Sequence, residues 1–208
     1  MAKLSRDFYV GDTVSIAKAL PGKYLVRRWH DDYLVCRIAE TEAYVGAVDK
    51  ACHAYGYRKT TRNATMFVQP GHAYIYLIYG VYSCLNFVTN PEGEPDAVLL
   101  RGLVPVYGVG TMSRLRFGKG YGDLTPYQRK NFLNGPGKCC KALSLDRSMN
   151  GADLTGEELF ICDSPSDIGL PEVPELPHRI RADKRVGIDY AEEARDYPWR
   201  FILEDAPC

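Results

Sequence analysis

The chain has 208 residues, 46% of them hydrophobic and 25% charged, and these ordinary globular values exclude a disordered, collagen-like or coiled-coil protein. A chain of this length buries roughly 70% of its unfolded surface, so it needs no disulfide or structural metal to fold. It has no run of about 18 apolar residues, which excludes an ordinary membrane-spanning helix.

The charges are balanced in total but unevenly distributed. The 26 basic and 26 acidic residues cancel, which by itself argues against a nucleic-acid-binding protein. However, residues 101–147 hold nine Lys and Arg against two acids, whereas residues 148–178 hold seven acids and no Lys or Arg. Such opposed blocks are typical of a protein with one face for a polyanion, although solvated loops can also carry them.

The first twelve residues lack the apolar stretch of a secretory signal. The seven cysteines are odd in number and have no regular spacing, so we expect reduced thiols in a cytoplasmic protein. Because they form no paired CxxC motif, the sequence predicts no structural metal.

The first half of the chain is predicted to be mainly β-structure. A capped start at Asp12, a turn between two apolar runs, and a long aromatic stretch interrupted at Gly80 provide the signals. In chain order we expect a helix at 12–21, strands at 23–29 and 32–44, a functional loop at 45–65, strands within 72–89, and a strand at 96–105.

The pattern of the second half changes to helical spacing and then returns to strands. We expect helices at 125–134 and 138–145, a strand at 158–163, a Pro-rich connector at 165–177 and a strand at 199–204. The 31 residues beyond the connector cannot form a core of their own. The sequence therefore predicts a mixed α+β chain with one compact domain over residues 1–208.

Two carboxylates and a tyrosine share one face at the end of the predicted strand 32–44. Side chains alternate along a strand, so Glu40, Glu42 and Tyr44 point the same way. A general base at the edge of a cleft explains such a face. A solvated strand edge also explains it, and so does the carboxylate pair of a glycosidase.

The aromatic stretch 72–89 is predicted to turn back at Tyr79 and Gly80. Tyr74 and Tyr82 fit a sheet core, whereas a tyrosine at a hairpin tip is exposed. Because a flat ring can stack on a base or enter a base step, Tyr79 is a candidate wedge for nucleic acid.

Two further segments could contact phosphates. The loop at 53–62 interleaves aromatic and hydroxyl residues with Arg58, Lys59 and Arg62. Residues 135–138 open a predicted helix with Lys138, although they lack the spacing of a nucleotide-binding loop.

The order of these motifs resembles the alkyladenine (3-methyladenine) DNA glycosylases of the mammalian and bacterial type. The motifs are ETEAY at 40–44, PG at 70–71, YIYLIYG at 74–80, VLLR at 98–101 and GPGKCCKAL at 135–143. The resemblance runs from about residue 12 to residue 204, and the spacing makes it specific. It implies a compact domain around a curved antiparallel sheet with flanking helices and a protruding hairpin.

The resemblance also implies a role for each matching residue. Glu42 is implied to be the base that activates water, and Arg101 to hold that water and a phosphate. Tyr79 is implied to be the intercalating wedge. The residues implied to form the base pocket are Tyr44, His53, Tyr76 and Asn86.

The implied protein is a monofunctional DNA glycosylase that flips and hydrolyses damaged purines, such as 3-methyladenine, 7-methylguanine, hypoxanthine or ethenoadenine. We expect it to act as a monomer on double-stranded DNA, without cofactor, metal or membrane. Its expected place is the cytoplasm and nucleoid of a bacterium, or the nucleus of a eukaryote. The alternative is a non-catalytic binder of damaged nucleic acid. Glu42 distinguishes the enzyme from such a binder, because a binder needs no carboxylate at the sugar.

Overall fold

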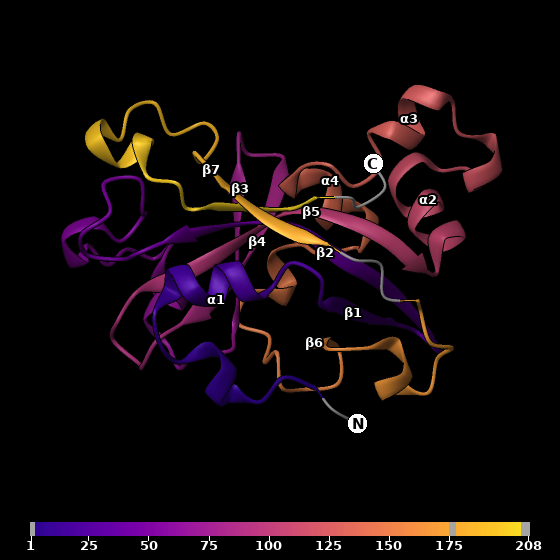
Figure 1. The fold of residues 1–208 in the computed structure, drawn as a ribbon, viewed down its shortest axis with the longest axis horizontal. Coiled ribbons are helices and arrows are strands. Elements are labelled where there is room, and N and C mark those ends of the chain that lie inside the picture. Colours follow the sequence, from indigo (N-terminus) through magenta and orange to yellow (C-terminus); the bar gives the residue numbers. More distant parts are fainter. Residues whose placement is uncertain (1–2, 175–177, 205–208) are drawn as a thin grey trace.

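The computed structural model describes residues 3–174 and 178–204, and an antiparallel β-sheet forms its centre (Figure 1). The strands are β1 Tyr24–Trp29, β2 Asp32–Tyr44, β3 Ala73–Ile78, β4 Tyr82–Thr89, β5 Asp96–Tyr107, β6 Leu159–Cys162, β7 Arg179–Asp183 and β8 Arg200–Glu204. The order across the sheet is β3-β4-β5-β2-β1-β6, with β8 paired to β2 and β7 paired to β8. The predicted curved antiparallel sheet in a single mixed α+β domain is confirmed.

The long strand β2 joins the two halves of the sheet. On one edge its first residues pair with β1, and Glu40–Glu42 pair with β8. On the other edge β2 pairs with β5, and the register shifts on both sides of Glu40. Because such irregularities bend a strand and redirect its side chains, β2 is curved where its carboxylates lie.

Four short helices flank the sheet: α1 Thr13–Ala19, α2 Val109–Phe117, α3 Pro126–Lys130 and α4 Pro136–Ala142. In Figure 1, α1 lies apart from the group formed by the other three. The Asp12 side chain accepts from the Ser15 amide at 2.8 Å, so the predicted N-cap of α1 is confirmed. The main core lies between the helices and the sheet, and it includes Leu34, Leu85, Phe87 and Leu100.

Several predicted boundaries and elements differ from the structure. The predicted helix at 125–134 ends at Lys130, and the one at 138–145 begins two residues earlier and ends at Ala142. Helix α2 was not predicted, because it starts and stops at left-handed glycines with no side-chain cap. Strand β7 was also missed. It is an edge strand whose residues are all exposed or partly exposed, so its sequence carries no apolar signal.

The segment between β2 and β3 is mostly irregular, as expected. It contains two short 3-10 turns, Tyr55–Tyr57 and Ala64–Phe67. A small apolar cluster joins this segment to the sheet and includes Cys52, Met66, Tyr74 and Val88. The loop is therefore packed against β3 and β4 at its base, where a pocket opens.

Candidate active site

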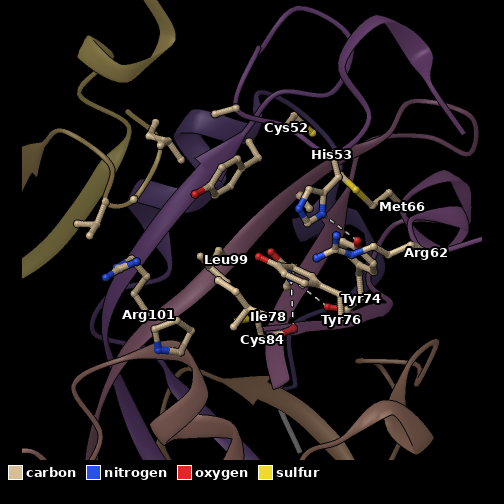
Figure 2. Close-up of a pocket in the computed structure, with 18 of the residues that line it drawn as sticks. Cys52, His53, Arg62, Met66, Tyr74, Tyr76, Ile78, Cys84, Leu99 and Arg101 are labelled. Carbon is tan, nitrogen blue, oxygen red and sulfur yellow. Dashed lines mark hydrogen bonds between the residues drawn. The ribbon is translucent and has the colours of Figure 1, made fainter. Parts of the chain in front are cut away.

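A pocket of about 430 Å³ lies between the sheet, the segment after β2 and the segment between β7 and β8 (Figure 2). Its volume is in the range of small-molecule sites. The side chains that line it include Tyr44, Cys52, His53, Arg62, Met66, Tyr74, Tyr76, Tyr79, Cys84, Asn86, Leu99, Arg101, Val186, Ile188 and Tyr190. All four predicted base-pocket residues and Arg101 are thus brought together from five separate stretches of the chain.

Aromatic rings form one wall of the pocket. The rings of Tyr74 and Tyr76 are 5.3 Å apart, and the imidazole of His53 meets Tyr76 edge-on at 4.6 Å. The His53 Nδ1 hydrogen-bonds the Tyr74 hydroxyl at 3.0 Å. Burial raises the pKa of both tyrosines, so their phenols stay protonated and the wall carries no negative charge.

His53 is neutral at physiological pH. Desolvation and the positive charge of Arg62 lower its pKa to about 4, although the residue keeps more than a third of its exposure. Even the ordinary pKa of 6.5 leaves the imidazole mostly neutral at pH 7.5. Because Nδ1 is bonded to the Tyr74 hydroxyl, Nε2 is left to make one hydrogen bond at the pocket, as donor or as acceptor according to the tautomer.

Asn86 lies at the floor of the pocket and is 4% exposed. Its Nδ2 donates to the Tyr74 carbonyl at 3.1 Å and lies 3.4 Å from the Cys84 carbonyl. These contacts fix the orientation of the amide, so its position relative to an occupant of the pocket is set by the backbone of β3 and β4.

Glu42 is fully buried and lies one layer behind the pocket wall. Its Oε2 accepts from the Tyr44 hydroxyl at 2.8 Å, and its Oε1 accepts from the Val186 amide at 2.8 Å. Arg101 Nε lies 3.4 Å from the same Oε1. All three partners line the pocket, whereas Glu42 does not reach its surface.

The pKa of Glu42 is raised, because burial outweighs the opposing effects of Arg101 and the two hydrogen bonds. A carboxyl in this state accepts a proton more readily than an exposed one, which is a property of a general base.

Arg101 connects the two carboxylates of β2. Its Nε lies 3.2 Å from Glu40 Oε1 as well as 3.4 Å from Glu42 Oε1. Within residues 3–174 and 178–204, the two Nη nitrogens of Arg101 make no hydrogen bond, and they remain available to an anion. Neither carboxylate lines the pocket, and Glu42 is buried, so the two do not flank the pocket as the carboxylates of a glycosidase flank their substrate.

Tyr79 is at the tip of the β3–β4 hairpin and is 86% exposed. Tyr79 and Gly80 have φ angles of 52° and 72°, and the Val81 amide donates to the Ile78 carbonyl at 3.3 Å. Both central residues of this β-turn therefore have positive φ, as in a type I′ turn, in which Asn-Gly is the favoured pair. The pairing of Ile78 with Tyr82 leaves Val81 as a third residue of the loop. A tyrosine in this left-handed conformation is strained, which favours a role outside the fold.

The four candidate phosphate-binding residues differ in their surroundings. Arg58 and Lys59 are exposed, and the Lys59 ammonium lies 5.1 Å from the ring of Phe67. Arg62 instead faces the pocket, where its guanidinium lies 5.1 Å from the ring of Tyr76. In Figure 2 it is seen with His53 across the pocket from Arg101.

Lys138 lies on α4, and its ammonium contacts Asn134 Oδ1 at 2.7 Å and Asn131 Oδ1 at 3.2 Å. An anion at Lys138 would therefore have to compete with two neutral amide oxygens, which is a weak barrier.

One side of the pocket was not predicted from the sequence. Val186, Ile188 and Tyr190 belong to the connection between β7 and β8, which carries no motif or periodic pattern. Only the fold reveals that this connection lies against β2, so no local signal could have identified these residues.

Among residues 3–174 and 178–204, no group of three or more His, Cys, Asp or Glu side chains could hold a metal ion. The same residues contain no helix that is both long and apolar enough to cross a membrane. Six cysteines are described, and all six are free and buried, while Cys208 lies outside the described residues.

The chain is similar to known proteins over nearly its whole length. A family model described as "Methylpurine-DNA glycosylase (MPG)" matches residues 7–207. A protein of Clostridioides difficile named "Putative 3-methyladenine DNA glycosylase" is 45% identical over 202 residues, which cover 97% of this chain and 100% of that protein. A protein of the same name from Alkaliphilus oremlandii is 46% identical over 206 residues, covering 99% and 97% of the two chains.

Proposed function

Because the chain belongs to the methylpurine-DNA glycosylase family, we propose that it excises alkylated or deaminated purines from duplex DNA as a monofunctional enzyme. The proposed substrates are 3-methyladenine, 7-methylguanine, hypoxanthine and ethenoadenine. The observation that carries this proposal is an aromatic pocket backed directly by a buried carboxylate of raised pKa. The chain is a DNA glycosylase by family, and its lesion specificity and catalytic steps are the proposed part.

The pocket suits a purine that has rotated out of the duplex. Unpairing and unstacking cost a few kcal/mol, and the cost is smallest for a damaged base. Stacking on Tyr76 recovers part of it, with Tyr44 and His53 as the other walls and Asn86 at the floor. An N-alkylated purine carries positive charge, so the electron-rich faces of Tyr44 and Tyr76 favour it over a normal base.

Hydrolysis needs a nucleophile at the sugar C1′ as the bond to the base breaks. In the proposed step Glu42 takes a proton from water, the water oxygen bonds to C1′, and the base leaves with the electrons of the glycosidic bond. Until it takes the proton, the Glu42 carboxylate also stabilises the positive charge that grows on the sugar. The products are the free base and an abasic site.

Glu42 must become accessible to water for this step, and Arg101 is the group whose movement would expose it. The Nη nitrogens of Arg101 have no partner among the described residues, so a phosphate can attract this side chain away from the β2 carboxylates. DNA binding would then expose the Glu42 carboxylate in the same event.

The described pocket lining contains no lysine, so a Schiff base with the sugar has no nucleophile there. We therefore propose simple hydrolysis without cleavage of the DNA strand. The proposed working form is a monomer on double-stranded DNA, with Tyr79 filling the vacated stack and Arg58, Lys59 and Lys138 at phosphates, in the cytoplasm and nucleoid of a bacterium. Arg62 lies at the pocket mouth, where it can reach the phosphates of the flipped nucleotide.

The test is single-turnover release of base from oligonucleotides that each carry one of the four lesions. Glu42→Gln keeps the shape of the side chain and is expected to slow release by about 10²–10⁴-fold, while binding to an abasic-site analogue survives. Glu40→Gln is the matched control, because Glu40 shares Arg101 but is not bonded to Tyr44 and Val186, the pocket residues that hold Glu42. Full activity in Glu42→Gln together with none in Glu40→Gln would refute the assignment. A wild-type protein that binds lesions and releases no base would favour the non-catalytic alternative.

A further inference from the structure

A buried ion pair lies beside the site, in a part of the chain that the proposed reaction does not use. Residues 184–199 connect β7 to β8 and are called the strap here. The side chains of Arg185 in the strap and Asp49 in the loop after β2 are both completely buried. Arg185 Nη2 donates to Asp49 Oδ1 at 2.9 Å, and Nη1 donates to Oδ2.

The same guanidinium contacts the backbone and the rings that surround Glu42. Its Nη1 donates to the Ala43 carbonyl at 2.8 Å, and its Nη2 donates to the Ala194 carbonyl at 3.0 Å. It also lies 4.7 Å from the ring of Tyr44. Arg185 therefore touches both residues that follow Glu42 in β2.

Attachment of the strap does not by itself account for this pair. Burying two charges is expensive, and apolar replacements of such pairs are often neutral or stabilising. The strap has a second and exposed attachment to the same loop, in which Lys50 pairs with Glu192 and Glu193. An apolar cluster that includes Ala51 and Ile188 attaches it as well.

The position of the pair in the chain suggests its role. Arg185 directly precedes Val186, whose amide donates to Glu42 Oε1 at 2.8 Å. Asp49 lies five residues beyond Tyr44, whose hydroxyl donates to Glu42 Oε2. The pair thus connects the two segments that supply hydrogen bonds to the two oxygens of Glu42.

We propose that Asp49 and Arg185 are positioning residues, which hold the Val186 amide on Glu42 Oε1 and so orient the carboxylate. The kinetic consequence rests on the proposed function, in which Glu42 activates water, whereas the geometric claim does not. A bidentate contact between a guanidinium and a carboxylate fixes the orientation of the strap, which the flexible ammonium of Lys50 cannot do.

The test is a titration of the Glu42 carboxyl in the DNA-free protein by carbon NMR, with the signal assigned by its loss in Glu42→Gln. The charged and titratable groups around this carboxyl are Glu40 and Tyr44 on β2, Tyr76 on β3, Arg101 on β5, Arg200 on β8 and Arg185. Arg185→Lys keeps every one of these charges and removes only the bidentate contact with Asp49. Lys50→Ala is the matched control, because it removes the exposed attachment of the same strap.

In Arg185→Lys the titration midpoint of Glu42 is expected to move to higher pH, because the carboxylate loses an amide that stabilises its charged form. In Lys50→Ala the midpoint stays at the wild-type value. In single-turnover assays below the midpoint, Arg185→Lys is expected to lose about tenfold in base release, the effect of one charge-assisted hydrogen bond. A general loss of folded protein would lower the amplitude of release equally at every pH and leave the midpoint unmoved.

A folded Arg185→Lys protein with the wild-type midpoint overturns the proposal. If Arg185→Lys does not fold, the neutral pair Asp49→Asn with Arg185→Gln replaces it, with the same expected direction. Failure of both variants to fold would also count against the proposal, because it would assign the pair to stability alone. Absence of base release by the wild type, with the Glu42 shift present, would refute the proposed function and leave this inference standing.

Discussion

Replacement of Tyr79 by asparagine separates the needs of the fold from those of the proposed wedge. The side chain is 86% exposed, so its removal costs little buried surface. Its backbone has φ 52°, in a left-handed region that costs most residues roughly 1–2 kcal/mol and that asparagine adopts more easily. Tyr79→Asn also creates the favoured Asn-Gly pair of a type I′ turn. We therefore expect the free energy of unfolding to stay constant or rise by up to about 1 kcal/mol.

The same substitution is expected to impair base flipping. An inserted ring is worth roughly 1–3 kcal/mol of stacking, so its loss lowers the flipped population by about 5- to 150-fold. The assays are urea unfolding for the fold and fluorescence of a reporter base in the duplex for flipping. Tyr127→Ala is the control, because Tyr127 is 76% exposed on α3 and does not line the pocket. A Tyr79→Asn protein that unfolds at lower urea and still flips its target would show that Tyr79 serves the fold.

Three further outcomes follow from the structure. Burial raises the pKa of Glu42 above the ordinary 4.5, so base release should decline with falling pH at a midpoint above that value, and Glu42→Gln should abolish the decline. The folded state also favours the protonated carboxyl. The stability that Glu42 contributes is therefore present at low pH and lost as pH rises through its folded pKa. Arg58→Ala should weaken DNA binding similarly for all sequences and reduce the slope of log affinity against log salt by about one, whereas a binding constant that ignores salt would exclude a phosphate contact. Gly108→Ala should lower the free energy of unfolding by several kcal/mol, measured by urea denaturation, because φ is 77° and a Cβ would lie 2.6 Å from Leu34. Gly118→Ala is the control and should cost about 1 kcal/mol in the same assay, because φ is 72° but the space around it is open.

Much of the sheet and the main side chains of the pocket could be predicted from the sequence. The alternation of Glu40, Glu42 and Tyr44 placed these side chains on one face of a strand, and the Tyr44–Glu42 hydrogen bond agrees with that placement. The hairpin tip at Tyr79 was predicted from Gly80 between two apolar runs, and its exposure follows. Both inferences depend on residues that are neighbours in sequence.

The depth of Glu42 and the surroundings of Arg62 could not be predicted in this way. Glu42 is covered by Val186, which lies 144 residues away, and its complete burial depends on that contact. Arg62 was expected at phosphates with Arg58, yet the packing of its loop against β3 turns it over the ring of Tyr76. The tertiary arrangement decides both features, and no local pattern specifies it.

The pairing of β8 with Glu40–Glu42 has a consequence for the order in which the molecule acquires its activity. Strand β8 is the last of the described strands to leave the ribosome, yet it completes the edge of β2 on which Glu42, the proposed general base, lies. A nascent chain that has emerged only as far as β6 leaves that edge unpaired and lacks the strap, whose Val186 amide holds the Glu42 carboxylate. We therefore expect lesion excision to begin only after residues 200–204 have emerged, so that incomplete translation products do not generate abasic sites.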